Sequence, residues 1–182
     1  MIITLGGRAG SGKSSVSKAL AAKLGYKRYS AGDIWRQCAA ERGMSVLEYN
    51  IRAEVETTID TMADEAQKKL GETEDNLVVE SRLGFFFIPN SIKIFLDAND
   101  EIRAKRTMEE GRTQENHKNF KEALKKLKAR DATDVKRYKK LYNVNPFDPK
   151  NYDFVVDTTT NSVEQTADMV YEFVMKRMKK QK

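Results

Sequence analysis

The residues from Gly7 to Ser14, GRAGSGKS, have the spacing Gly, four residues, then Gly-Lys-Ser. Glycines let a backbone bend tightly and approach a ligand with no Cβ in the way. A loop of this kind aims unpaired backbone N–H groups at phosphate oxygens, while Lys13 supplies a charge for the β- and γ-phosphates and Ser14 a hydroxyl for Mg²⁺. The loop therefore predicts a site for ATP with Mg²⁺ as its cofactor.

This chemistry needs a strand before the loop and a helix after it. Ile2-Ile3-Thr4-Leu5 is β-branched or apolar, as a buried strand is. Residues 15–24 carry apolar side chains at helical spacing, and Gly25 provides a stop. Because the strand, the spacing and the helix agree, a glycine-rich turn that binds nothing is disfavoured.

Strands and helices alternate along the rest of the chain. Further strands are predicted at 26–29, 77–79, 91–96 and 154–157. Helices are predicted at 30–43, 45–51, 54–70, 100–110, 116–142 and from Ser162 onward, with a turn at 71–75. This order is typical of βαβ units and predicts an α/β fold, a five-stranded parallel sheet with helices on both faces.

Length and composition bound the class of protein. The 182 residues suffice for one domain with its own core. No apolar run reaches transmembrane length, and the first residues are typical of a core strand rather than a signal peptide. Cys38 is the only cysteine, which excludes an internal disulfide framework and favours a reducing compartment. We therefore expect a cytoplasmic protein without a membrane partner.

The net charge of +6 is concentrated in residues 99–140, which hold 14 Lys/Arg and 8 Asp/Glu. A basic segment favours polyanionic ligands, a class that includes nucleotides and nucleic acids. A solvated helix surface with i,i+4 ion pairs explains most of these lysines equally well. The segment lacks interleaved aromatic residues for stacking on bases, which argues against a nucleic-acid partner.

Ligands of parallel sheets bind beyond the carboxyl ends of the strands, so the residues that follow each predicted strand are candidates for a site. Phosphoryl transfer needs positive charge there, and the planar fork of Arg suits phosphate. The charged candidates are Asp33, Arg36, Glu80, Arg82, Arg103, Arg106, Arg130, Asp134 and Arg137. Each also has a plainer explanation as a surface residue, an ion pair or a helix cap, and the residues alone leave both open.

Several stretches resemble those of the nucleoside monophosphate kinases, and within them the short cytidylate kinases typical of archaea. They are GGRAGSGKSS, YSAGDIWRQCAAERGM, NLVVESRL, IKIFLDANDEIRAKR and ARDATDVKRYKKLYNVN. The resemblance implies a three-layer P-loop kinase fold in a single domain, residues 1–182, with mobile acceptor-binding helices at about 30–70 and a mobile lid at about 103–130. It implies transfer of the ATP γ-phosphate to CMP or dCMP. An exposed cleft with moving parts favours a monomer.

The resemblance also implies roles for single residues. The ATP-binding residues would be Gly7, Arg8, Ala9, Gly10, Ser11, Gly12, Lys13, Ser14 and Ser15, with Arg103 and Arg106 reaching ATP from the lid. Arg36, Arg82 and Arg137 match positions that hold the acceptor phosphate, and Arg130 and Asp134 match positions near the acceptor sugar. Glu80 matches a position that faces the acceptor base or the water shell of the metal, and Asp33 is counted with the acceptor-binding residues. The catalytic group is Lys13, Arg82, Arg106 and Arg137.

Two departures from the family pattern concern the acceptor base. The chain has no room for the inserted base-reading subdomain of the larger bacterial cytidylate kinases. It also has Ser81 between Glu80 and Arg82, where glycine is common. A kinase for another nucleoside monophosphate or a small metabolite therefore stays an alternative, followed by a P-loop module that binds RNA. A regulatory GTPase is least favoured, since no Asn-Lys-x-Asp stretch is present.

Overall fold

The computed structural model describes residues 1–182 apart from 45–47, 50–51, 53–55, 110–118 and 181–182. Its centre is one sheet of five parallel strands in the order β2-β3-β1-β4-β5. The strands are β1 (Ile2–Gly7), β2 (Lys27–Ser30), β3 (Leu77–Glu80), β4 (Ile92–Asp97) and β5 (Phe154–Asp157). The predicted number of strands and their parallel direction are confirmed.

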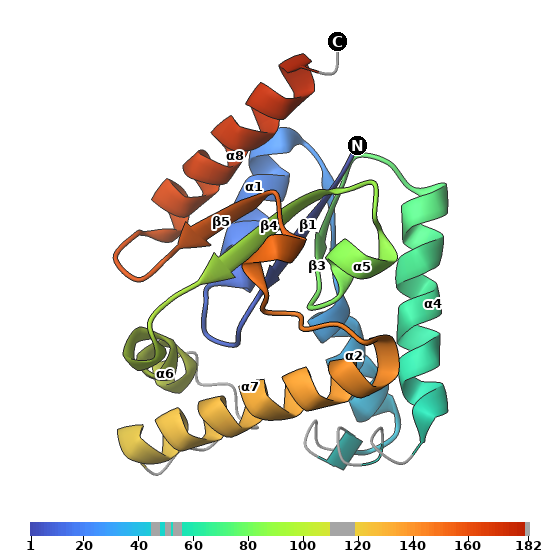
Figure 1. The fold of residues 1–182 in the computed structure, drawn as a ribbon, viewed down its shortest axis with the longest axis vertical. Coiled ribbons are helices and arrows are strands. Elements are labelled where there is room, and N and C mark those ends of the chain that lie inside the picture. The colour runs from blue at the N-terminus through green and yellow to red at the C-terminus, as the bar shows by residue number, and fades with distance from the viewer. Residues whose placement is uncertain (45–47, 50–51, 53–55, 110–118, 181–182) are drawn as a thin grey trace.

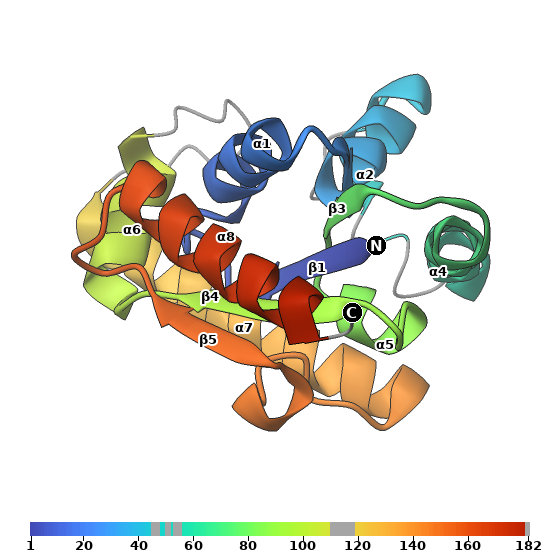
Figure 2. The same ribbon diagram turned by 90° about the horizontal axis from the view of Figure 1, so that it is seen from above.

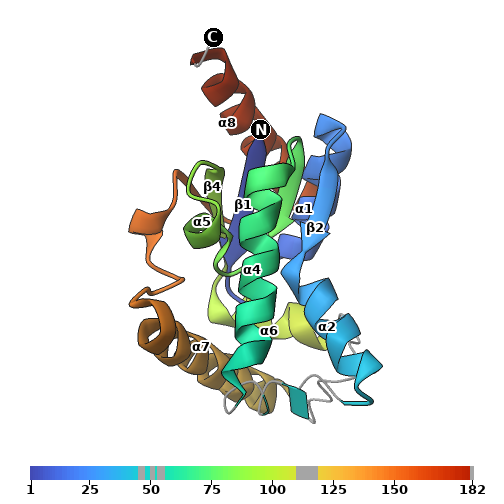
Figure 3. The same ribbon diagram turned by 90° about the vertical axis from the view of Figure 1, so that its right-hand side faces the viewer.

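Helices connect the strands and form the outer layers. They are α1 (Lys13–Leu24), α2 (Ala31–Glu41), α4 (Thr57–Thr73), α5 (Gly84–Phe87), α6 (Asp100–Glu109), α7 (Phe120–Tyr142) and α8 (Val163–Lys180), with a 3-10 turn at Pro149–Asn151. Helices α1 and α8 cover one face of the sheet, and α4 and α5 pack on the other (Figure 2). Helices α2, α6 and α7 lie where the strands end (Figure 1, Figure 3).

The central strand β1 is buried along its whole length because both faces of the sheet are covered. Ile3 and Leu5 pack in the cluster that includes α1 and α8, whereas Ile2 packs with Val79 and Phe87 in the cluster on the other face. A near-continuous apolar run is what this environment requires. It fixes the loop that follows β1 at the middle of the carboxyl edge.

The turn predicted at 71–75 is wrong at its start, because α4 continues through Gly71 to Thr73. A Cβ on Gly71 would lie 3.1 Å from Cγ2 of Ile88, so the glycine permits close packing against the segment after α5 rather than ending the helix. The short helix α5 was not predicted. Most of the helix expected at 45–51 falls outside the described residues, although 48–49 are described and helical. Parts of the segments 30–70 and 103–130 also fall outside the described residues. Among the helices described, none is both long and apolar enough to cross a membrane.

Candidate active site

The loop between β1 and α1 has the backbone of a phosphate-binding loop. Gly7, Gly10 and Gly12 have φ values of +145°, +75° and +82°, a region that side chains with a Cβ rarely adopt. Gly12 is the N-cap of α1 and offers no side chain to the first turn of the helix. The N–H groups at this helix end are therefore available to an anion, and the helix dipole favours negative charge there.

Lys13 lies inside the loop and donates from Nζ to the backbone oxygen of Arg8 at 2.6 Å. The pKa of Lys13 is lowered to about 7, chiefly by burial and the charge of Arg82, against the opposing charge of Glu80. Arg130 and Arg103 make smaller contributions to the same lowering. Cationic residues from separate elements thus converge on one lysine, which an incoming polyphosphate would stabilise in its charged form.

Glu80, at the end of β3, faces the first turn of α1. Its Oε1 accepts from Ser14 Oγ at 2.7 Å, and its Oε2 accepts from Ser17 Oγ at 3.2 Å and from Arg28 Nη2 at 2.5 Å. Burial alone raises the pKa of the Glu80 carboxyl, but the hydrogen bonds of Ser14 and Arg28 and the charge of Lys13 outweigh it, and the pKa lies below its ordinary value. The carboxylate is therefore ionised beside Ser14 at neutral pH.

The hydroxyl of Ser14 and the carboxylate of Glu80 are hard oxygen donors of the kind that Mg²⁺ prefers. No group of three or more His, Cys, Asp and Glu side chains suited to a metal occurs among the described residues. A metal that brings its own phosphate ligands needs only one or two such groups from the protein. The pair fits a nucleotide-bound Mg²⁺ better than a resident metal.

Arg28, on β2, was not predicted as part of the site. Its Nε donates to Ser17 Oγ at 2.7 Å and its Nη1 to Asp33 Oδ2 at 3.0 Å, in addition to the bond to Glu80. The sequence signal was its place in the strand: Arg28 and Ser30 share one face of β2, whereas Lys27 points to solvent and pairs with Glu74.

Asp33 is held between two arginines. The N-cap of α2 is Ser30, whose Oγ accepts from the backbone N–H of Asp33 at 3.2 Å, so Asp33 itself is not the cap. The Asp33 carboxylate accepts from Arg28 and from Arg36. Burial raises the pKa of Asp33, but the two arginines outweigh that effect and the pKa lies below its ordinary value. The sequence had left open a plain capping role, and the structure gives that role to Ser30.

The other predicted acceptor residues come from β3 and α7. Arg82 Nε lies 2.7 Å from Asp134 Oδ2, and the pair is largely buried. Arg137 has its guanidinium carbon 5.6 Å from the centre of the Trp35 ring on α2. Arg130 acts electrostatically on Lys13, as Arg82 does. The structure thus brings the arginines after β3 and on α7 to the same edge as the phosphate loop.

Arg103 and Arg106 have different surroundings, although the sequence treats them alike. Arg103 is completely buried and donates four hydrogen bonds, to Ala9 O, Asp100 Oδ1 and both oxygens of Asp131. Its guanidinium therefore joins the phosphate loop to α6 and α7. The expected contact of Arg103 with ATP from the lid stays a prediction.

Arg106 remains beside the loop. Its Nη1 and Nη2 donate to Oγ1 and O of Thr158 at 3.0 and 2.7 Å, and Thr158 Oγ1 donates to Ser11 O at 3.1 Å. A cavity of about 380 Å³ opens here. Its lining includes Ser11, Gly12, Ser15, Arg106, Thr158 and Asn161. Thr158 and Asn161 were not predicted, although Thr158 directly follows β5 and Asn161 lies in the same connection to α8.

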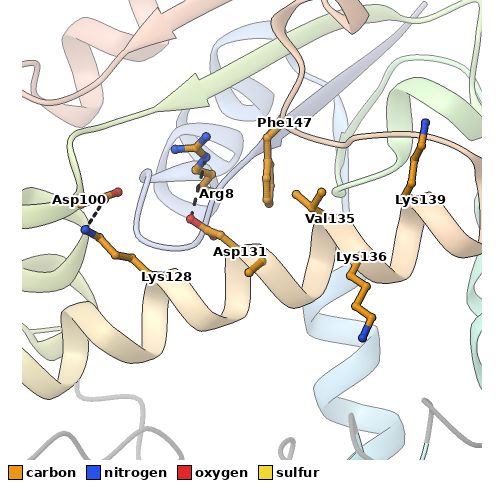
Figure 4. A pocket seen from close by; sticks show the side chains of 9 residues that line it. Arg8, Asp100, Lys128, Asp131, Val135, Lys136, Lys139 and Phe147 are labelled. Atoms are coloured by element: carbon orange, nitrogen blue, oxygen red, sulfur yellow. Dashed lines mark ion pairs between the residues drawn. The ribbon is translucent and has the colours of Figure 1, made fainter.

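Arg8 points away from this cavity. Its guanidinium carbon lies 5.3 Å from the centre of the Phe147 ring, and its Nη1 and Nε lie 3.7 and 4.0 Å from Asp97 and Asp131. It lines a second cavity of about 550 Å³ beside α7, together with Phe147, Val135 and lysines of α7 (Figure 4). The side chain of Arg8 therefore lies outside the space next to Gly12, and only its backbone belongs to the phosphate loop.

Comparisons with known proteins identify the family of the chain. Residues 2–160 match the Cytidylate kinase-like family. Proteins named cytidylate kinase from Methanocella arvoryzae and Archaeoglobus fulgidus are 36% and 34% identical to the chain, over 96% of it and 97% and 94% of their own lengths. The relative of the same name from Methanosphaera stadtmanae is 32% identical, over 93% of this chain and 95% of its own.

Solved structures share the fold at low sequence identity. A shikimate kinase from Acinetobacter baumannii has a TM-score of 0.64 and 18% identity, covering 97% of this chain and 93% of its own. An uncharacterized protein from Eubacterium ventriosum has a TM-score of 0.69 and 22% identity, covering 96% and 98%. These likenesses establish the P-loop kinase fold.

Proposed function

The chain belongs to the Cytidylate kinase-like family, and from this premise we propose that it transfers the γ-phosphoryl group of ATP to CMP or dCMP, giving ADP and CDP or dCDP. One observation carries the proposal: the charges of Arg82 and Arg130 converge on Lys13 inside the phosphate loop. A reaction between two phosphate groups requires this concentration of positive charge, because its transition state spreads negative charge over several oxygens.

ATP is proposed to bind with its phosphates on residues 7–15 and its nucleoside in the cavity lined by Arg106, Thr158 and Asn161. Lys13 would leave the Arg8 oxygen for the β- and γ-phosphates. Mg²⁺ would be held by Ser14 and the phosphates, with Glu80 beside it, and would neutralise phosphate charge. Because Glu80 accepts a hydrogen bond from Ser14, we propose that Glu80 faces the water shell of the metal rather than the acceptor base.

The acceptor is proposed to lie between α2 and α7. Arg36, Arg82 and Arg137 would hold its phosphate, while Arg130 and Asp134 meet its sugar. The acceptor is already a phosphate anion, so no general base is needed and transfer is direct and in line. Lys13, Arg82, Arg106 and Arg137 would stabilise the transferring group. We also propose that residues 1–182 act as one domain and as a monomer, without nucleic acid.

A coupled assay of ADP release tests this function, with ATP, Mg²⁺ and a panel of CMP, dCMP, UMP, AMP and GMP. Strong turnover with CMP or dCMP over the others is expected, and Lys13→Ala should abolish it while far-UV circular dichroism stays unchanged. Turnover restricted to AMP or GMP would contradict the acceptor but not the chemistry. ATP binding without turnover of any nucleotide would contradict the kinase proposal for this panel.

A further inference from the structure

Arg28 uses each nitrogen of its guanidinium on a different element. Nε donates to Ser17 on α1, Nη2 to Glu80 at the end of β3, and Nη1 to Asp33 on α2, at 2.7, 2.5 and 3.0 Å. Its side chain is 17% exposed and that of Glu80 is 10% exposed. The geometry requires a rigid fork with several donors, which arginine has and lysine lacks.

The bonds of Arg28 continue on both sides into the proposed site. On one side Glu80 accepts from Ser14, the proposed metal-binding serine. On the other side Asp33 accepts from Arg36, a proposed ligand of the acceptor phosphate. A chain of five side chains, Ser14, Glu80, Arg28, Asp33 and Arg36, therefore runs from the phosphate loop to the acceptor helix.

Stability alone is a weak reason for this arrangement. Burying an ion pair costs desolvation energy that the attraction between the charges barely repays, so an apolar pair of similar size is often as stable. The arrangement does fix orientation, because both oxygens of Glu80 and both oxygens of Asp33 have donors. Supporting hydrogen bonds of this kind keep ligand-binding groups in their productive geometry.

We propose that Arg28 is a positioning residue of the acceptor site, which fixes the Glu80 carboxylate beside the phosphate loop and, through Asp33, holds Arg36 at the acceptor phosphate. This inference rests on the proposed function, since it assumes a phosphate acceptor at α2. Loss of Arg28 frees Asp33 and Glu80 together. The affinity for the acceptor should fall more than the affinity for ATP. Arg36 loses the carboxylate that holds it in place, whereas the loop that binds ATP keeps its own backbone donors.

The test compares Arg28→Met and Arg28→Lys with Lys27→Met, which removes the same charge from the neighbouring residue on the exposed side of β2. The dissociation constant of CMP is measured by calorimetry without ATP or metal, and that of ATP with a ribose-labelled fluorescent analogue. Losing a supporting residue of this type typically costs about 10–100-fold. We expect that loss for CMP in both Arg28 variants, with ATP affinity changed by less than about threefold and Lys27→Met unchanged.

The conservative variant separates positioning from charge. If Arg28→Lys binds CMP as the wild type does, a positive charge alone suffices and the proposal is overturned. Equal losses of affinity for CMP and ATP would show that Arg28 has only a structural role, and would also overturn the proposal. Asp33→Asn should weaken CMP binding in the otherwise wild-type protein. It should cause little further loss of CMP affinity in the Arg28→Met background, because the two changes act through one chain of hydrogen bonds.

A double-mutant cycle on urea unfolding tests the contact between Arg28 and Glu80 even if the proposed function fails. Arg28→Met and Glu80→Gln should together destabilise the fold by less than the sum of their separate effects, because both changes disrupt the same charged contact. Lys27→Met should be additive with Glu80→Gln. Additive losses for Arg28→Met and Glu80→Gln would overturn the proposal for Glu80, whereas a wild type that turns over no acceptor would contradict only the function.

Discussion

Nη2 of Arg103 donates to both carboxylate oxygens of Asp131, at 3.0 and 2.8 Å, so that α6 is bound to α7 beneath the phosphate loop. The Nε of the same guanidinium donates to Ala9 O in the loop at 2.8 Å. Burial raises the pKa of Asp131 and the charge of Arg103 opposes that rise, yet the pKa remains above its ordinary value. The loop is therefore supported from below by a buried charge rather than by apolar packing.

Arg103→Met is expected to lower the free energy of unfolding by about 3–5 kcal/mol, because it leaves the Ala9 oxygen without this donor and Asp131 with only the more distant Arg8. Urea unfolding followed by circular dichroism measures the change. Arg177→Met is the matched control, since Arg177 pairs with Asp153 at an exposed site, where a pair contributes about 1 kcal/mol or less. Equal losses in the two variants would contradict the supporting role of Arg103.

Gly10→Ala should weaken ATP binding as well as stability. Gly10 has φ +75°, and a Cβ there would lie 2.5 Å from the backbone oxygen of Arg103. Gly43→Ala has the same conformational strain, at φ +64°, with nothing within 4 Å of the added Cβ. The strain costs about 1–2 kcal/mol at either position. Only Gly10→Ala also has to displace α6 from the loop.

The contrast between the two variants is measured by urea unfolding and by titration with a fluorescent ATP analogue. Gly10→Ala is expected to lose more stability than Gly43→Ala, and ATP affinity should fall only in Gly10→Ala. Similar behaviour of the two variants would mean that α6 does not press on the loop in solution.

The fold could be predicted from the sequence where local sequence patterns and burial agree. The apolar run before Gly7 and the alternation of strands with helices were enough to predict the sheet. The turn predicted to begin at Gly71 was wrong because this position needs a glycine for the close approach of Ile88. Ile88 lies 17 positions further along the chain, and local propensity does not detect such a contact. A glycine inside a helix and a glycine at its end are indistinguishable until the partner is known.

The site was partly predictable for a similar reason. Lys13 and Ser14 belong to a motif whose spacing carries its mechanism, so their surroundings could be expected. Arg28, Arg103 and Arg106 are single arginines, and spacing does not reveal which of them is buried. Burial decides the difference: Arg103 is enclosed by Asp100, Asp131 and Ala9, whereas Arg106 lines a cavity.

ATP binding should take up a proton near pH 8. Burial and Arg82 hold the pKa of Lys13 at about 7 in the ligand-free protein, so at pH 8 most molecules carry a neutral lysine. Phosphate oxygens favour the charged form and raise that pKa, and the proton comes from the buffer. Calorimetry of MgATP binding in HEPES and in Tris should give different enthalpies, less exothermic in Tris, which ionises with the larger heat.

Lys13→Arg is the control for this proton, because a guanidinium stays charged at every pH used. Its binding enthalpy should be the same in both buffers. The buffer difference of the wild type should also shrink at pH 6, where Lys13 is already protonated. Equal wild-type enthalpies in HEPES and Tris at pH 8 would show that the lysine is charged before ATP arrives.

Acceptor binding should be visible in the fluorescence of Trp35. It is the only tryptophan of the chain, and Arg137 lies over its ring at 5.6 Å. If Arg137 moves from the ring to the acceptor phosphate, CMP should change the emission of Trp35 and ATP alone should not. Arg137→Met should abolish the response and weaken CMP by about 10–100-fold, as expected for a charge-assisted hydrogen bond of about 1.5–3 kcal/mol.

Two further variants make this result specific. Arg82→Met should weaken CMP to a similar degree but keep the Trp35 response at saturating CMP, because Arg137 is intact. Lys136 directly precedes Arg137 on α7 and is an exposed lysine that lines the cavity beside Arg8. Lys136→Met removes its charge and should leave both CMP affinity and Trp35 emission unchanged. CMP and ATP affinities that fall equally in Arg137→Met would contradict its place at the acceptor. A Trp35 response to ATP alone would mean that Arg137 responds to the donor instead, since cation–π contacts of this kind are weak enough to yield to either phosphate.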